Sequence, residues 1–187
     1  DQVLTADSAQ ALGVKWASAS SGVWSQLGTD SSDSGKAQLQ VSFTMHDVLS
    51  VFFLGCSAGT TEDDIRIQLN DTGGTAYSMR GDYSSSETSF QAQANWSATF
   101  GNNTAQRPTF FQLVLWKKDA NIVGDSMVNG IMLGAVNIDG GSSPPIVNTL
   151  ASSGLLFDSS ATIASLEVFH GSDNVIGNLQ VNGMNYA

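Results

Sequence analysis

Residues 39–46 read Leu-Gln-Val-Ser-Phe-Thr-Met-His, in which an apolar and a polar residue alternate four times. Successive side chains of a β-strand point to opposite faces, so this alternation predicts a strand with one face in a hydrophobic core and the other in solvent. The same pattern returns at residues 65–70, Ile-Arg-Ile-Gln-Leu-Asn. Residues 48–54 and 110–116 are almost continuously apolar, which is typical of strands covered on both faces.

The pattern of apolar and polar residues predicts strands in the rest of the chain as well. Tyr77 and Met79 begin a return strand after the turn signal Asn-Asp-Thr-Gly-Gly at residues 70–74. Residues 126–137 have the length of a helix, but their glycines and β-branched residues favour a strand. Further candidates are residues 90–96, 163–169 and 175–181. Roughly ten to twelve short strands, separated by turn signals about 8–12 residues apart, predict an all-β fold, and we expect an antiparallel two-sheet β-sandwich of jelly-roll-like form.

Residues 1–37 differ in composition from the rest, and we interpret them as an N-terminal arm or stalk junction, with the sandwich formed by residues 38–187. The segment is rich in Ser, Gly, Ala and Asp, and residues 28–35 (Gly-Thr-Asp-Ser-Ser-Asp-Ser-Gly) are expected to form a loop. Its apolar anchors include Trp16 and Trp24. We therefore expect the arm to pack through these two tryptophans on the body or on a neighbouring subunit.

The charge composition excludes several classes of partner. The chain has 187 residues, of which 7 are Lys or Arg and 17 are Asp or Glu, and its net charge is −10. Phosphate binding needs clustered Lys and Arg, so neither nucleic acid nor an anionic membrane surface is an expected partner. No run of the sequence is long and apolar enough to predict membrane insertion. The single cysteine, Cys56, excludes an internal disulfide framework.

Two segments of the chain resemble parts of a known group of proteins. Residues 1–17 (Asp-Gln-Val-Leu-Thr-Ala-Asp-Ser-Ala-Gln-Ala-Leu-Gly-Val-Lys-Trp-Ala) resemble a segment of many tailed-bacteriophage virion proteins, which there joins a repetitive stalk to a C-terminal head domain. Residues 64–80 (Asp-Ile-Arg-Ile-Gln-Leu-Asn-Asp-Thr-Gly-Gly-Thr-Ala-Tyr-Ser-Met-Arg) are similar to a hairpin of phage fibre and tail head domains. The resemblance implies a structural protein of the virion surface that contacts other virion proteins.

The same resemblance implies a homotrimer, because such stalks are commonly three-stranded, and attachment to bacterial surface polysaccharide without enzymatic activity. A sugar site combines an aromatic face, which packs on sugar C–H groups, with polar side chains that bind hydroxyl groups. Aromatic and charged residues in polar surroundings are therefore the candidates for ligand binding. They are Tyr77, Arg80, Asp82 and Tyr83.

Other functions remain open. A capsid decoration or head-fibre domain would have a purely structural role, with its apolar surface at subunit contacts. A glycan-binding domain, whether part of a virion or a free-standing sugar-binding module, would instead present a concave patch of polar and aromatic groups. A glycan-degrading enzyme would need two carboxylates that face one cleft at about 5–10 Å.

Several short motifs match catalytic or metal-binding patterns, but each has a simpler explanation. Residues 55–59 match Gly-x-Ser-x-Gly, and Ser57, Asp125 and His170 follow the chain order of an α/β-hydrolase triad, but that nucleophile elbow needs a helix directly after it. Asp-Ser-Gly and Asp-Thr-Gly, at residues 33–35 and 71–73, match aspartic proteases but lie in polar, turn-forming segments. The acidic residues 62–64 offer Ca²⁺ ligands without EF-hand spacing. We therefore assign no catalytic residue, no metal site and no cofactor.

Overall fold

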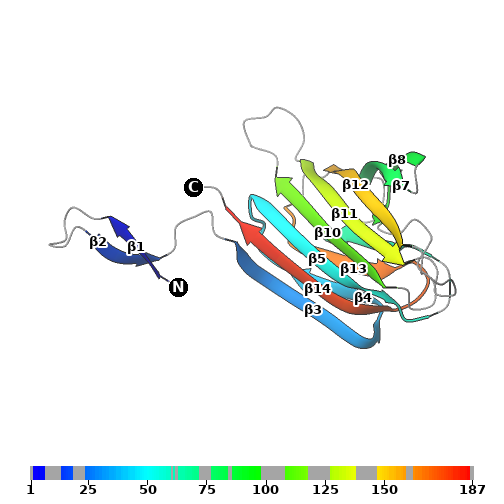
Figure 1. The fold of residues 1–187 in the computed structure, drawn as a ribbon, viewed down its shortest axis with the longest axis horizontal. Helices are drawn as coiled ribbons and strands as arrows, with labels where there is room; N and C mark the ends of the chain where they lie inside the picture. Colours follow the sequence, from blue (N-terminus) through cyan, green and yellow to red (C-terminus); the bar gives the residue numbers. More distant parts are fainter. Residues whose placement is uncertain are drawn as a thin grey trace.

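The computed structural model describes residues 2–6, 14–18, 24–59, 61, 63–71, 77–83, 86–97, 108–117, 127–137, 147–158 and 162–185. Every regular element within these ranges is a β-strand. The strands are numbered β1 to β14, and every pairing between them is antiparallel (Figure 1). This confirms the expected all-β class. It also confirms a strand for residues 127–137, where the length of the segment alone had allowed a helix.

The strands form two large layers and one small ribbon. The larger sheet has eight strands in the order β3 (Ser25–Lys36), β14 (Val175–Met184), β5 (Val48–Ser57), β10 (Thr109–Lys117), β11 (Met127–Asn137), β12 (Val147–Asp158), β7 (Tyr77–Tyr83) and β8 (Ser86–Gln93). The smaller sheet has the order β4 (Gln38–Ser42), β13 (Ser165–His170), β6 (Ile65–Leu69) and β9 (Trp96–Ser97). The ribbon pairs β1 (Gln2–Ala6) with β2 (Val14–Ser18).

The path of the chain is that of a jelly roll. Strands β3 to β6 lie alternately in the larger and the smaller sheet, and β9, β10, β13 and β14 alternate back again. The early strands pair with the late ones in nested order, β3 with β14, β4 with β13, β5 with β10 and β6 with β9. Such nesting is what a long antiparallel hairpin makes when it is rolled into two layers. Strands β7, β8, β11 and β12 are additions that widen the larger sheet.

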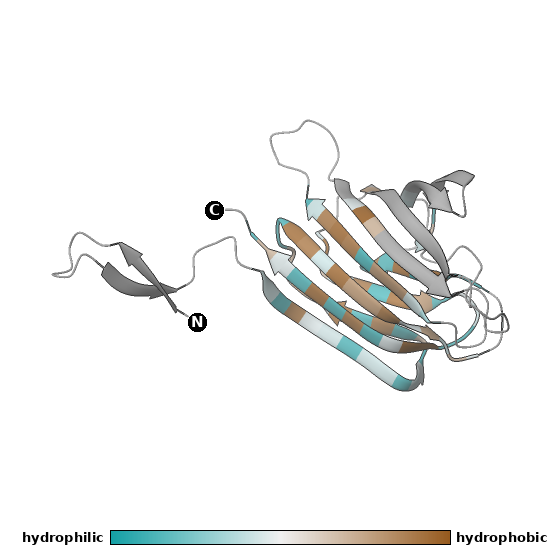
Figure 2. Ribbon diagram, in the orientation of Figure 1, coloured by the Kyte–Doolittle hydropathy of each residue, from teal (hydrophilic) through white to brown (hydrophobic). Residues whose placement is uncertain are grey.

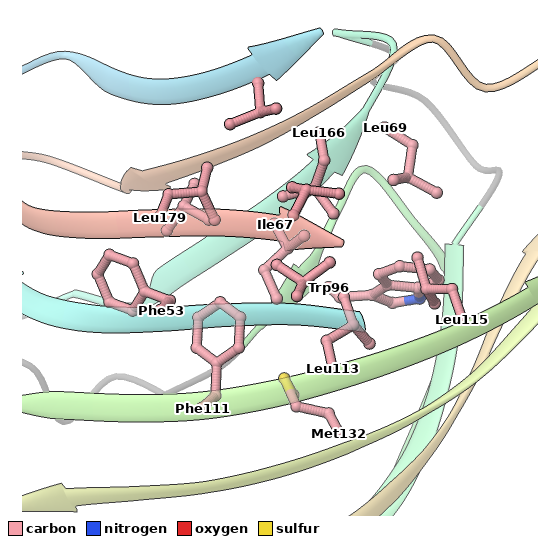
Figure 3. Close-up of a cluster of buried hydrophobic side chains, with 14 of the residues drawn as sticks. Phe53, Ile67, Leu69, Trp96, Phe111, Leu113, Leu115, Met132, Leu166 and Leu179 are labelled. Atoms are coloured by element: carbon pink, nitrogen blue, oxygen red, sulfur yellow. The ribbon is translucent and has the colours of Figure 1, made fainter. Parts of the chain in front are cut away.

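The core lies between the facing sides of the two sheets (Figure 3). In β4, Leu39 and Val41 are buried and their polar neighbours are exposed, as the alternation of this segment predicts. From the larger sheet, Phe53 and Phe111 stack on each other with ring centroids 5.1 Å apart. Each large apolar side chain buried in this way contributes about 1.5–3 kcal/mol to folding. The interlocking side chains of both layers therefore fix how the loops at the ends of the sandwich are placed.

The predicted boundary at residue 37 is wrong. Residues 25–36, assigned to the arm, form β3, an edge strand of the larger sheet that pairs with β14 along its length. The segment lacks apolar alternation because it needs little apolar surface: the carboxylate of Asp30 accepts hydrogen bonds from the Ser31 and Gln40 amides and pairs with Lys36. Polar and charged residues are a common means of protecting an exposed sheet edge.

The hairpin predicted for residues 64–80 is also wrong, although its turn exists. Asn70 and Asp71 have φ of 57° and 51°, and the Asn70 side chain bonds to the backbone of residues 162–165. However, β6 belongs to the smaller sheet and β7 to the larger one. The segment thus crosses from one layer to the other, and a period of two carries no information about which sheet a strand joins.

The outer face of the larger sheet departs from the expectation that its central strands are covered on both sides. Leu54 of β5 is 56% exposed, Phe110 of β10 is 44% exposed, and Trp116 at the end of β10 is 36% exposed. Their neighbours in sequence, such as Phe53 and Phe111, are in the core. The strands formed by these apolar runs therefore have one buried face and one apolar face that is exposed to solvent. Figure 2 shows the concentration of hydrophobic residues on β5 and β10.

Candidate functional site

Three strand connections meet at one end of the sandwich. Val175, the first residue of β14, is paired with both Ser57 at the end of β5 and Lys36 at the end of β3. At the other end of the same strands, Gly183 is paired with Ser25, where the chain enters the sandwich. We call the Val175 end the distal end, because it lies opposite the point where the N-terminal segment joins and the chain terminates (Figure 1).

A hollow of about 570 Å³ lies at the distal end. Two of the connections that form it, residues 58–64 and 171–174, are joined by hydrogen bonds from the Ala58 amide to the Asn174 carbonyl (2.8 Å) and from the Gly171 amide to the Asp64 carbonyl (3.0 Å). Its lining is small and polar: Ala37, Ala58, Gly59, His170, Gly171, Ser172, Asp173 and Asn174. None of these described lining residues is Phe, Tyr or Trp.

Asp173 connects the two loops. Its Oδ2 accepts a hydrogen bond from the Thr61 amide at 3.0 Å and lies 3.4 Å from Ser57 Oγ. Gly59 permits this approach, since a Cβ at that position would lie 2.4 Å from the Asp173 carboxylate. Ser57 is fully buried and its Oγ accepts the Gly59 amide at 3.1 Å. The Ser57 hydroxyl thus contacts both the turn at Gly59 and Asp173 of the neighbouring loop.

Asp63 forms a second polar group beside the hollow. Its Oδ1 contacts Arg66 Nη2 at 2.7 Å, and its Oδ2 accepts the Ser172 hydroxyl at 2.5 Å. Burial opposes the ionisation of Asp63, but the hydrogen bonds from Ser172 and the Asp64 amide, together with Arg66 and His170, outweigh it and lower the pKa of Asp63. The carboxylate is therefore ionised at neutral pH and holds the Arg66 guanidinium at the edge of the site.

His170, the last residue of β13, is held by the backbone of the loop that follows it. It is 4% exposed, and its Nδ1 accepts the Asp173 amide at 2.9 Å and the Ser172 amide at 3.3 Å. The imidazole thereby shapes the 171–174 loop.

The Gly-x-Ser-x-Gly motif does not have the setting of a nucleophile elbow in the part of the chain that the structure describes. Residues 58 and 59 are a bend, and the next regular element is strand β6 instead of a helix. The carboxylate near Ser57 is Asp173, whereas Asp125 lies outside the described residues. The strand–turn–helix geometry that exposes a catalytic serine is therefore missing here.

The structure does not place the predicted ligand residues at this hollow. Tyr77 is fully buried in the core, where its hydroxyl bonds to the Leu69 amide (2.8 Å) and carbonyl (3.2 Å) and its ring packs against Trp96 and Phe157. Tyr77 has no exposed ring face for a sugar, so its assignment is wrong. Burial, only partly offset by the bond with Leu69, raises the pKa of Tyr77 to about 12.

The other predicted ligand residues, Arg80, Asp82 and Tyr83, belong to the backbone of β7, and their side chains lie outside the described part of the structure. Strand β7 is separated from β5 by three strands, which is four strand spacings or roughly 19 Å. These residues therefore do not share a site with the loops around Asp173.

The two tryptophans assigned to the arm lie in different settings. Trp16 is in β2 of the ribbon, where its backbone is paired with Leu4; its side chain is outside the described part. Trp24 directly precedes β3 and is 46% exposed. Their predicted role in subunit contact stays a prediction.

Sequence reasoning missed Arg66, Ser172 and Asp173 as site residues. One signal was available, since residues 171–174 (Gly-Ser-Asp-Asn) form a short polar run between two predicted strands. Nothing local showed that this run meets residues 58–64, more than a hundred positions away, because that contact depends on the pairing of β5 with β14.

The described residues include neither a metal-binding cluster nor a membrane-spanning helix. Among them, no three or more His, Cys, Asp or Glu side chains gather in a way that could hold a metal ion. None of the described segments forms a helix long and apolar enough to cross a membrane. No protein-family model matches this chain, and no curated protein matches it.

Proposed function

We propose that this chain is a non-enzymatic head domain of a phage virion protein, which attaches to glycans on the host surface through the hollow at its distal end. The observation that carries the proposal is the position of this hollow. The segment that resembles a stalk junction enters at one end of the sandwich, and the polar hollow lies at the opposite end, where an attachment site on a stalk would face the host.

The hollow offers the polar groups of a sugar site, without a Phe, Tyr or Trp ring among its described lining residues. Its volume is within the range of about 300–1,000 Å³ common for small-molecule sites. Sugar hydroxyls both donate and accept hydrogen bonds, and the hollow offers a carboxylate (Asp173), an amide (Asn174) and a hydroxyl (Ser172). A net charge of −10 disfavours acidic polysaccharides, so we expect neutral glycans to bind best.

The partners in this proposal come from the resemblance of residues 1–17. This resemblance implies a homotrimer on the virion surface, in contact with other virion proteins. Three weak sites on one stalk would bind a surface with an avidity well above that of a single site.

The test is binding of the whole chain to a glycan array and to bacterial cells, with Asp173→Asn as the variant. An amide in place of the carboxylate still accepts the Thr61 amide but loses its charge, and charge-assisted hydrogen bonds are worth about 1.5–3 kcal/mol. We expect glycan affinity to fall at least about tenfold. Asp47→Asn is the matched control, because Asp47 precedes β5 at the other end of the sandwich. Equal binding by the two variants would count against the proposal.

A structural role as a capsid decoration or head-fibre domain is the second candidate, and the exposed apolar side chains of β5 and β10 favour it. Tight binding to purified capsids, with no binding to cells or glycans, would support that role. The enzymatic alternative is tested in the same glycan samples, since a glycan-degrading domain would release reducing ends during the incubation.

A further inference from the structure

The outer face of the larger sheet carries a patch of apolar side chains that is interrupted on β10 by Gln112. In register, Leu54 lies opposite Phe110, and Val114 lies opposite Ile131, so the apolar positions of β5, β10 and β11 adjoin each other. Directly opposite side chains on one face are about 4.5–5.5 Å apart at Cβ. We define the apolar patch as Phe52, Leu54, Phe110, Val114, Trp116 and Ile131, four of which are 36–56% exposed.

A row of amide side chains borders the patch. Strand β14 places Asn178 beside Leu54, Gln180 beside Phe52 and Asn182 beside Ser50. An apolar centre rich in Phe and Trp with a polar rim is the composition of a protein–protein interface. Isolated apolar side chains are common on surfaces, whereas a contiguous patch across several strands marks an interaction site.

The face carries no charged side chain at its described positions, which are those of the apolar patch with Cys56, Gln112, Ile176, Asn178, Gln180, Asn182 and Met184. In contrast, the smaller sheet has Arg66 on an outward position, and the edge strand β3 of the larger sheet has Asp30, Asp33 and Lys36. Where its side chains are described, the outer face of β14, β5, β10 and β11 thus carries no charge, which avoids repulsion between copies that each have a net charge of −10.

We propose that this face is the surface through which copies of this chain bind each other. In a two-fold contact the patch meets the same patch of the other copy, and in a three-fold ring it meets a different part of the neighbouring copy. In either arrangement a buried carboxylate or ammonium group needs a partner of opposite charge. Apolar groups need no such partner, and amides both donate and accept hydrogen bonds.

The extent of the face fits this role. Four strands about 4.8 Å apart and about eight residues at 3.3 Å each give a flat area on the order of 500 Å². Side-chain relief increases the accessible area toward the roughly 800 Å² per partner that stable complexes bury. The inference concerns association alone and stands whether or not the chain binds glycans.

The experiment is sedimentation of the whole chain over a wide concentration range. We expect the wild type to sediment at a multiple of its 19.6 kDa mass. Leu54→Glu and Ile131→Glu place a charge in the patch, and both are expected to sediment as single chains with an unchanged circular dichroism spectrum. The control is Gln38→Glu, which adds the same charge at an exposed position of β4 in the smaller sheet and should leave the oligomer intact.

A second measurement needs no variant. Cys56 lies two residues beyond Leu54 on the same strand face, so association should slow its alkylation as the protein concentration rises. A wild type that stays a single chain at all concentrations, with a constant alkylation rate, would overturn the proposal. Folded Leu54→Glu and Ile131→Glu proteins that remain oligomeric would overturn it as well.

Discussion

Glu167 is a carboxyl group in a setting that disfavours its charge. It is 1% exposed in the middle of β13, where its Oε1 accepts Gln40 Nε2 at 2.6 Å and lies 3.3 Å from the Ser165 hydroxyl. Burial raises the pKa of Glu167 above its ordinary value; the hydrogen bond from Gln40 opposes this shift, and the charge of Asp71 adds to it. The folded protein therefore keeps this proton at a pH where the unfolded chain has lost it.

This shift predicts the sign of a pH effect. A carboxyl group with a raised folded pKa stabilises the fold fully below its unfolded pKa, near 4.5, and this contribution is lost as the pH rises through the folded pKa. Glu167→Gln has no proton to lose, so the variant should gain stability relative to the wild type as the pH rises above the unfolded pKa of Glu167. Urea unfolding at several pH values checks this. The difference must grow with pH; a constant or shrinking difference would contradict it.

The contribution of strand β3 to the stability of the sandwich can be tested by truncation. Removal of residues 1–23 keeps β3 and its pairing with β14, so it should lower the free energy of unfolding far less than removal of β3 does. Removal of residues 1–37 deletes β3, bares the edge of β14 and removes the Asp30 contact with Gln40. An exposed strand edge pairs with other chains, so this product should aggregate or unfold. A stable, soluble chain of residues 38–187 would show that the arm does extend to residue 37.

The strands that could be predicted from the sequence are those with one apolar face. Residues 39–42 and 65–69 alternate strictly, and both became strands with the expected residues buried. Strand β3 could not be recognised, because an edge strand held by Asp30 and by pairing with β14 carries no apolar period. The hollow was missed for a related reason. It depends on long-range strand pairing that brings residues 58–64 to residues 171–174, and no local pattern encodes that pairing.

At the scale of the whole molecule, the two proposed surfaces do not overlap. The hollow lies at the distal end of the sandwich, between the ends of β3, β5 and β14. The apolar patch extends along the outer face of the larger sheet, over the middle strands β5, β10 and β11. Copies that associate through the sheet face with their strands pointing the same way would keep their distal ends free on one side, so that several hollows could contact one surface together.

This separation predicts that affinity and avidity respond to different mutations. Leu54→Glu, which should yield single chains, leaves the hollow untouched and is expected to bind a short soluble glycan with an unchanged Kd in calorimetry. Its binding to whole cells should fall by roughly 10²-fold or more, because linked sites gain that much from multivalency. Asp173→Asn should weaken binding in both assays, since it alters every site. If Leu54→Glu weakened soluble-glycan binding as much as cell binding, the sheet face itself would be the glycan site, and the distal hollow would lose its assigned role.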